Sequence, residues 1–322
     1  MKSLVEKIVT LIRETSSSLP EDVLKALQAA QRKETKGSSA AVVLKTILDN
    51  CVIAKERGTP LCQDTGTLTF FVDERLRRKV TPAVLKKAVA LATERGYLRK
   101  NTIDSVTGKS YDDNCADGAP VVHYIGSDRV GLGSDSVGLG SVGVAARSKD
   151  AKRLYADAKR LYADAKRPYA DAKRPYVTLI LKGGGSENMS RQYSLPDAAL
   201  GAGRDLAGVR KCVLDAVQKI QGYGCAPGIL GVCVGGDRAT GYEIAKEQLL
   251  RPLGEAASSP LLGKLEKRLL KEANSLGIGP MGLGGKTTLL GVKVAARPRV
   301  PASFFVTVAY MCWACRRRSC VI

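Results

Sequence analysis

Apolar residues recur at helical spacing through the first 57 residues of the chain. Residues 4–12 place leucines and isoleucines on one helical face. Pro20, followed by two acidic residues, is typical of the first turn of a second helix, and residues 40–54 form a third periodic run. The pattern therefore predicts a helical front end.

Short β-prone runs and longer amphipathic runs then follow in irregular order. The expected strands are 68–72, 177–181, 229–234, 289–294 and 303–308, the last being the final strand of the chain. The expected helices are 82–94, 206–220, 240–250 and 260–274. Because helices and short strands mix without regular strand–helix–strand alternation, we predict an α+β fold rather than a doubly wound α/β fold.

A repetitive segment interrupts this order at residues 126–176. The heptad Asp-Ala-Lys-Arg-Leu-Tyr-Ala begins at Asp150, and Pro replaces Leu in the last two of its four copies. Proline breaks a helix, and two adjacent large apolar residues do not form a coiled-coil seam. We therefore predict a single domain over residues 1–322 that carries a low-complexity, basic heptad-repeat insertion at 126–176.

The composition limits the classes of protein to be considered. Of the 322 residues, 44% are hydrophobic and 25% are charged, as in an ordinary globular protein. No run approaches the roughly 20 apolar residues of a membrane helix, so we expect no membrane association.

The net charge of +20 permits a nucleic acid or an acidic protein as partner. Aromatic residues make up only 5% of the chain, and no nucleic-acid-binding module is recognisable, which disfavours nucleic acid. We prefer a solvated basic face, to which the run Arg316–Arg318 contributes. A non-catalytic basic binding protein remains the alternative from another class.

The nine cysteines are odd in number and irregular in spacing, and the charged N-terminus does not resemble a signal peptide. We therefore expect reduced thiols and a cytoplasmic location. Cys62, Cys225 and Cys312 differ from the rest because each lies beside an expected strand, near glycine, proline or small polar residues. Three thiolates do not complete a tetrahedral zinc site, but they could hold an iron–sulfur cluster that leaves one iron open.

Two glycine-rich segments are candidates for anion binding. Residues 183–185 follow an expected strand and form either a flexible turn or a close backbone approach to a ligand. Residues 279–288 resemble a phosphate loop but have Pro280 where that motif needs glycine. An anion-binding loop with Lys286 as its cation remains possible there.

Taken together, the motifs resemble those of the α subunit, or N-terminal region, of class I iron–sulfur fumarate hydratases and the related L-tartrate dehydratases. The matching segments occur in the family's order and cover nearly the whole chain outside 126–176. They are 60–67, 96–99, 182–188, 225–236, 276–287 and 301–314.

This resemblance implies reversible hydration of fumarate to (S)-malate on a 4Fe–4S cluster, with the open iron as Lewis acid. By motif, Cys62, Cys225 and Cys312 would bind three irons, and the fourth iron would take the substrate. Asp64 would be the catalytic residue, as the candidate for proton transfer. The substrate, a small dicarboxylate, would be bound by Gln63, Arg99, Gly185 and Lys286.

The chain also departs from the family pattern. The family's second subunit or C-terminal domain is missing, so the resemblance implies a separate β subunit in a heterodimer or α2β2 assembly. The family's histidine near Val300 is absent, and the single histidine, His123, is expected to be structural. An L-tartrate dehydratase α subunit remains the alternative within the class.

Overall fold

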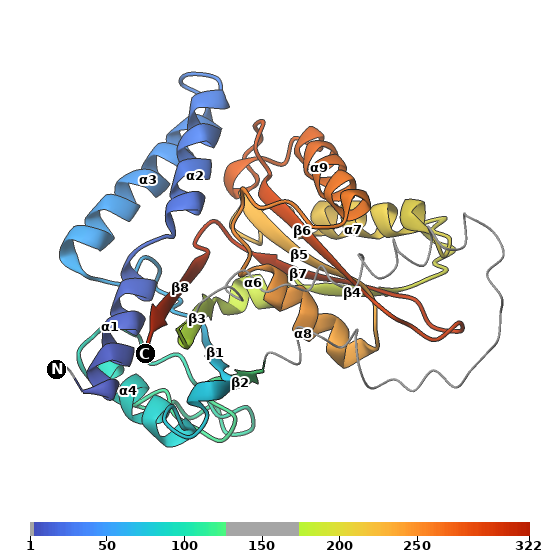
Figure 1. Ribbon diagram of the computed structural model, residues 1–322. Helices are drawn as coiled ribbons and strands as arrows, with labels where there is room; N and C mark the ends of the chain where they lie inside the picture. Colours follow the sequence, from blue (N-terminus) through green and yellow to red (C-terminus); the bar gives the residue numbers. More distant parts are fainter. Residues whose placement is uncertain (1–2, 127–173) are drawn as a thin grey trace, which may run out of the picture.

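The computed structural model describes residues 3–126 and 174–322, and in these residues two four-stranded sheets form the framework (Figure 1). The first sheet has the order β2 (Val121–Ile125), β1 (Thr67–Asp73), β3 (Tyr176–Lys182), β8 (Arg316–Val321). The second has the order β4 (Arg191–Ser194), β7 (Phe305–Met311), β5 (Gly228–Gly235), β6 (Leu289–Arg297). Both sheets are mixed, because β1–β2 and β5–β6 are parallel and the other pairs are antiparallel.

Helices cover the faces of both sheets, which confirms the predicted α+β class. The front end consists of α1 (Leu4–Ser17), α2 (Glu21–Lys33) and α3 (Ser39–Arg57). The other helices in the described residues are α4 (Pro82–Glu94), α6 (Gly184–Asn188), α7 (Leu206–Ile220), α8 (Arg238–Gln248) and α9 (Pro260–Ser275), with short 3₁₀ turns η1 (Glu74–Leu76) and η3 (Pro280–Gly282).

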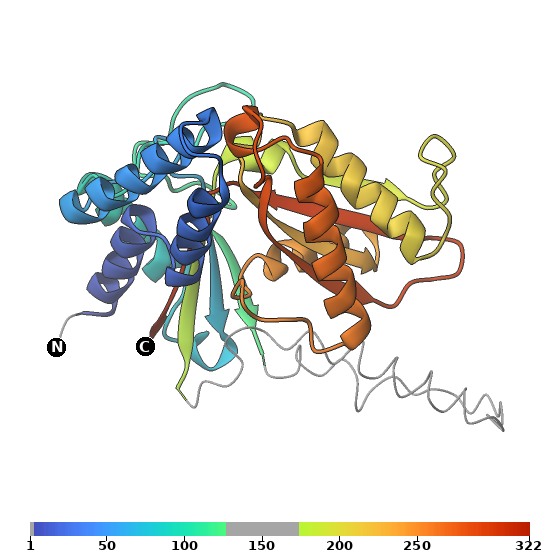
Figure 2. The same cartoon turned by 90° about the horizontal axis from the view of Figure 1, so that it is seen from above.

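The core is divided among the layers between helices and sheets (Figure 2). Helices α1 and α4 pack on one face of the first sheet, and α7 and α9 pack on one face of the second. The remaining faces meet in a shared core with α2, α3 and α8, where Ile180 of the first sheet belongs to the same apolar cluster as Met311 of the second. The two sheets are therefore packed on common side chains.

Most element boundaries fall close to the predicted ones, and the shifts have local causes. Helix α4 begins at Pro82, where the Thr81 hydroxyl accepts a hydrogen bond from the Val84 amide. Helix α8 begins at Arg238 rather than at Thr240, because the Asp237 carboxylate caps it by accepting from the Ala239 and Thr240 amides. Strand β3 begins at Tyr176, so that residue does not belong to the predicted insertion. Residues 127–173 of the insertion lie outside the described residues.

The prediction for the C-terminal arginines is wrong. Residues 303–308 were expected to form the last strand, but β8 follows and pairs with β3. Arg316 is fully buried and Arg317 is 5% exposed, so this run does not form a solvated basic face. The Arg317 guanidinium instead forms an ion pair with Asp22, with 2.6 Å between Nη2 and Oδ2. Three successive arginines predict an exposed segment, because charged side chains are rarely buried without a partner. Here the partner of Arg317 comes from α2, which is far away in the sequence.

Candidate functional site

The sheet topology gathers several strand ends at one place. Because β3 is antiparallel to both β1 and β8, the end of β3 lies beside the starts of β1 and β8. In the second sheet, the start of β5 lies beside the end of β7, with Ile229 opposite Met311. The chain passes directly from β7 in one sheet to β8 in the other through residues 312–315, so the two groups of strand ends are neighbours.

The three singled-out cysteines lie on these strand ends and converge. Cys62 precedes β1, Cys225 precedes β5 and Cys312 follows β7. The pKa of the Cys225 thiol is raised by partial burial, and further by the nearby Cys312 and Cys62 thiols and the Asp64 carboxylate. All three cysteines are free; Cys225 is exposed, and Cys62 and Cys312 are half-buried. The structure therefore brings the three thiols and one carboxylate together at an accessible surface.

Backbone contacts hold two of these cysteines in place. Cys225 has a φ of +50°, which is uncommon for a residue with a side chain and is found preferentially at functional positions. Its carbonyl oxygen accepts a hydrogen bond from the Trp313 amide at 3.3 Å, and the Cys312 amide donates to Ser186 Oγ at 3.1 Å. The segments that carry Cys225 and Cys312 are thus joined to each other and to α6.

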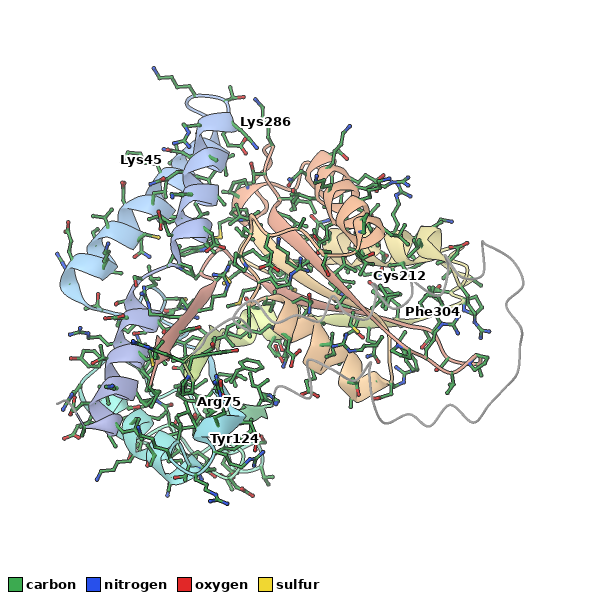
Figure 3. All side chains as sticks on the ribbon, in the orientation of Figure 1. Lys45, Arg75, Tyr124, Cys212, Lys286 and Phe304 are labelled. Carbon is green, nitrogen blue, oxygen red and sulfur yellow. The ribbon has the colours of Figure 1, made fainter. Side chains whose placement is uncertain are left out.

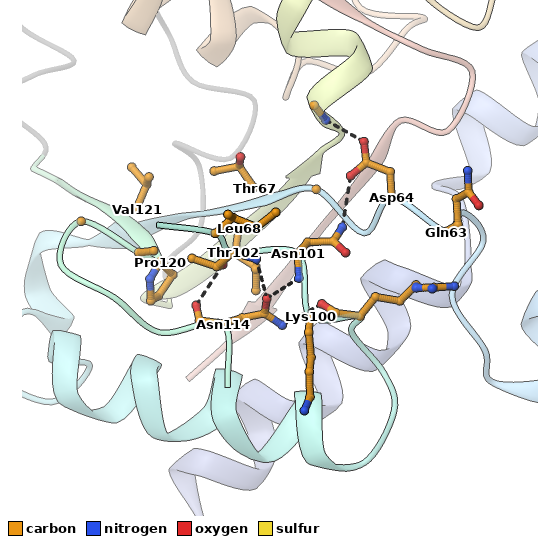
Figure 4. Close-up of a pocket in the computed structure, with 16 residues that line it drawn as sticks. Gln63, Asp64, Thr67, Leu68, Lys100, Asn101, Thr102, Asn114, Pro120 and Val121 are labelled. Atoms are coloured by element: carbon orange, nitrogen blue, oxygen red, sulfur yellow. Dashed lines mark hydrogen bonds between the residues drawn. The ribbon is translucent and has the colours of Figure 1, made fainter. Parts of the chain in front are cut away.

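The Asp64 carboxylate is fixed by two hydrogen bonds (Figure 4). Its Oδ2 accepts from the Gly184 amide at 2.7 Å, and its Oδ1 accepts from Asn101 Nδ2 at 3.2 Å. A Cβ atom on Gly183 would lie 2.8 Å from Oδ2, so only glycine lets the backbone approach this closely. The glycine-rich segment after β3 therefore positions Asp64 as well as being a candidate ligand contact.

A cavity of about 610 Å³ opens beside Asp64. Three of the predicted residues line it: Gln63, Asp64 and Arg99. Arg99 is exposed, and within residues 3–126 and 174–322 its guanidinium has no carboxylate in ion-pair distance. The cavity thus combines a fixed carboxylate with a cation available to an incoming anion.

Asn114 positions the arginine and was not singled out from the sequence. It is buried at a φ of +60°. Its Oδ1 accepts from the amides of Asn101 and Thr102, and its Nδ2 donates to the Arg99 carbonyl oxygen at 2.8 Å. Asparagine tolerates the left-handed region, but a lone Asn in a loop carries no such signal until its partners are known.

A buried lysine beside Cys312 was likewise missed. Lys182 is 5% exposed, forms an ion pair with Glu187 and donates a hydrogen bond to Ser190 Oγ. Burial lowers its pKa, and the neighbouring Glu187 carboxylate and Cys312 thiol only partly oppose this.

The other two predicted binding residues are placed differently. Gly185 lies in the first turn of α6, next to the amide that Asp64 uses. Lys286 does not line the cavity; it lies near the loop between α2 and α3 (Figure 3). Its amide donates to both carboxylate oxygens of Glu34. This glycine-rich loop therefore binds an anion that belongs to the chain itself, and the structure does not bring Lys286 together with the other predicted residues.

The donor set fits an iron–sulfur cluster in its chemistry. Each iron of such a cluster takes one cysteine thiolate, and three free thiols converge here from separate segments. Within the described residues, no three His, Cys, Asp or Glu side chains lie close enough to hold one metal ion. A buried hydroxyl without a hydrogen-bond partner in these residues, that of Tyr310, interacts electrostatically with the Cys312 and Cys225 thiols.

Comparison with known proteins assigns the family. The chain matches the fumarate hydratase (Fumerase) family over residues 5–142 and 167–321. The chain belongs to this family. It is 43% identical to a Geobacillus stearothermophilus protein provisionally named a class I fumarate hydratase, over 98% of this chain and 54% of that protein. It thus spans about half the length of that relative.

Two further relatives are named as subunits. A Methanocaldococcus jannaschii protein, provisionally named an L(+)-tartrate dehydratase subunit alpha, is 31% identical over 96% of this chain and 94% of its own length. The L(+)-tartrate dehydratase subunit alpha of Escherichia coli K12 is 25% identical over 100% of this chain and 91% of its own length. Among the helices that the structure describes, none is both long and apolar enough to cross a membrane.

Proposed function

We propose that this chain is the α subunit of a 4Fe–4S hydro-lyase that interconverts fumarate and (S)-malate. The observation that carries this proposal is the convergence of Cys62, Cys225 and Cys312 next to Asp64, which itself lines a cavity together with Arg99. Membership of the fumarate hydratase family supports the reaction class. The three thiolates would hold three irons of the cluster, and the open iron supplies Lewis acidity toward the substrate when the cluster is bound.

The residues around the cavity have separable tasks. Arg99 binds one substrate carboxylate, because its planar guanidinium can donate two parallel hydrogen bonds to it. Gln63 contributes amide contacts, and the Gly185 backbone faces the other end of the dicarboxylate. Asp64, oriented by Asn101 and the Gly184 amide, accepts or returns a proton at whichever lone pairs of Oδ1 and Oδ2 those donors leave free.

A separate β subunit completes the proposed enzyme, as a heterodimer or an α2β2 assembly. The chain corresponds to 54% of a fumarate hydratase relative but to more than 90% of two tartrate dehydratase α subunits. We infer that the remaining substrate contacts come from this partner. A reducing, cytoplasmic environment suits the free thiols at the site.

Tartrate dehydration is the second candidate within this class. The subunit-sized relatives carry that name, and a cationic pocket beside a Lewis-acidic iron suits either 2-hydroxy diacid. A non-catalytic basic binding role is less supported, because the chain belongs to the fumarate hydratase family, and because two of the three C-terminal arginines are buried and so add no charge to a binding surface.

The test is anaerobic co-expression with a β partner, followed by iron and sulfide analysis and by hydration assays with fumarate and dehydration assays with L-tartrate. About four irons with fumarate turnover supports the proposal, and turnover of tartrate alone selects the second candidate. Cys62→Ser should lose both the visible absorbance and the iron, whereas Cys51→Ser, at a buried cysteine in α3, should lose neither. A Cys62→Ser protein that keeps its iron contradicts the ligand assignment.

A further inference from the structure

The Tyr310 hydroxyl is a buried polar group without a hydrogen-bond partner in the described part of the chain. The side chain is 1% exposed, and it points from the end of β7 into the apolar layer between the second sheet and α7. Folded proteins rarely leave a buried hydroxyl unpaired, so this exception calls for a physical reason.

The phenol ring is held against the segment that carries Cys225. A Cβ atom on Gly224 would lie 2.4 Å from Tyr310 Cε1, and one on Gly228 would lie 2.4 Å from Oη. Neither position accepts a side chain without moving the ring. The backbone on both sides of Cys225 is therefore packed on the phenol, and the hydroxyl lies at the Gly228 end of this slot.

Hydrogen bonds to two serines fix the backbone that carries Tyr310 and Cys312. The Tyr310 amide donates to Ser190 Oγ at 3.3 Å, and two residues later the Cys312 amide donates to Ser186 Oγ at 3.1 Å. The hydroxyl interacts electrostatically with the thiols of Cys312 and Cys225. A phenol hydroxyl can donate one hydrogen bond, and a thiolate or sulfide sulfur can accept it.

We propose that the Tyr310 hydroxyl would donate a hydrogen bond to a sulfur atom of the cluster held by this site. This inference rests on the proposed function, because it requires the cluster. Tyr310 acts as a positioning residue and does not touch the substrate. Since a hydrogen bond to sulfur stabilises the more negative, reduced cluster, it raises the reduction potential.

The test compares Tyr310→Phe with Tyr193→Phe in the full chain, co-expressed with its β partner and reconstituted without oxygen. Tyr193 is a matched control, because it packs against the same core from the adjacent strand β4 and its hydroxyl donates to Asp215 Oδ2 at 2.8 Å. The measurements are iron content, a spectroelectrochemical titration of the cluster and the urea midpoint of the cluster-free chain.

Tyr310→Phe should retain iron but shift the ratio of oxidised to reduced cluster about tenfold toward oxidised at a fixed potential, about 59 mV for one electron. Its cluster-free urea midpoint should stay equal to wild type or rise, since no hydrogen bond within the chain is lost. Tyr193→Phe should do the reverse, lowering the urea midpoint and leaving the potential unchanged.

An unchanged potential in Tyr310→Phe, or an equal shift in Tyr193→Phe, overturns the assignment. If Tyr310→Phe fails to fold, the wild-type protein is compared before and after refolding in D₂O. Loss of a strong proton coupling to the reduced cluster in D₂O supports the hydrogen bond. Absence of any exchangeable proton coupling refutes it. If wild type binds no iron, the proposed function fails together with this inference. If wild type binds iron but Tyr310→Phe has the same reduction potential, only the role assigned to Tyr310 is refuted.

Discussion

Asp64 depends on a neighbour that has no side chain. Gly183 is buried, and the space where its Cβ would be is occupied by Asp64 Oδ2 at 2.8 Å. The same close approach lets the Gly184 amide donate to the carboxylate at 2.7 Å. A side chain at residue 183 would therefore displace the carboxylate that faces the cavity.

Replacing Gly183 by alanine should lower kcat by roughly a hundredfold, because a displacement of about 1 Å in a reacting group has that order of effect. Iron content should be retained, since none of the thiols moves. Turnover of the reconstituted enzyme and its iron content are the measurements. Gly254→Ala is the matched control, because its Cβ would meet no atom within 4 Å. Equal kcat values for the two variants would contradict the role of Gly183.

Lys293 is a second residue whose behaviour follows from burial. It lies in β6, is 3% exposed, and donates to the carbonyl oxygens of Leu253 and Glu255. Burial lowers its pKa to about 8, from an ordinary value of 10.5. Between pH 8 and about 10.5 the unfolded chain therefore binds more protons at this residue than the folded chain does.

The contribution of Lys293 to the free energy of unfolding should accordingly increase as the pH rises from 8 to 10, by about 2–3 kcal/mol. Urea unfolding at several pH values measures it as the difference between wild type and Lys293→Met. Other groups titrate in this range, but they do so in both proteins and cancel in the difference. If the difference in free energy of unfolding stays constant with pH, the pKa of Lys293 is not lowered in the folded protein.

At the scale of elements, β8 connects the front end to the sheets. Its two faces carry different partners, because successive side chains of a strand point to opposite sides. Arg317 faces α2 and forms a bidentate contact with Asp22, while it also donates to the backbone carbonyls of Leu249 and Arg251. One buried guanidinium thus joins α2, β8 and the loop after α8.

Arg317→Met should destabilise the fold by about 3–5 kcal/mol, because it leaves the partly buried Asp22 carboxylate without its cation and two carbonyl groups without the guanidinium donor; the Leu253 amide remains as a donor to Asp22. The free energy of unfolding from urea titration measures this. Lys45→Met removes the exposed ion pair with Asp49 and should cost less than about 1 kcal/mol. If the two variants lose similar free energies of unfolding, burial of the Arg317–Asp22 pair does not add to its contribution to stability.

At the scale of the whole molecule, the described elements pack on one another through apolar cores that lie apart from the proposed cluster site. Helix–sheet layers and the core shared by both sheets contain buried side chains from the front end to β8. The cysteines lie at the edge of this framework, where β1, β5 and β7 begin or end. A ligand bound there adds stability by binding the folded state, and we expect the strands to pair without it.

Removal of the cluster with a chelator under oxidising conditions should therefore leave the far-UV circular dichroism essentially unchanged and lower Tm by several degrees. The two signals, recorded before and after chelation, are the measurement. Cys62→Ser without chelator should reproduce the lower Tm. Loss of secondary structure on chelation would show that the cluster is part of the folding core.

The local chemistry of the chain determined most of its elements. Proline and acids at helix starts, apolar periodicity and glycine at strand ends predicted the front end and strands such as β1, β3 and β5, because these signals depend on neighbours within a few residues. The sequence also singled out Cys62, Cys225 and Cys312, since each stands in a distinctive local context.

Only the tertiary structure decided the features that depend on contacts between residues far apart in the sequence. Strand β8 was missed because a run of arginines is typical of an exposed surface, whereas in the fold Arg317 is buried and pairs with Asp22 of α2. The same holds for Asn114, which anchors the Arg99 segment, and for Lys286, whose amide binds Glu34 away from the cavity. It holds also for Tyr310, because only the folded core shows that its hydroxyl has no partner in the described residues. Convergence of the three thiols is a product of sheet topology, because only the antiparallel pairing of β1, β3 and β8 and of β5 with β7 brings those strand ends together.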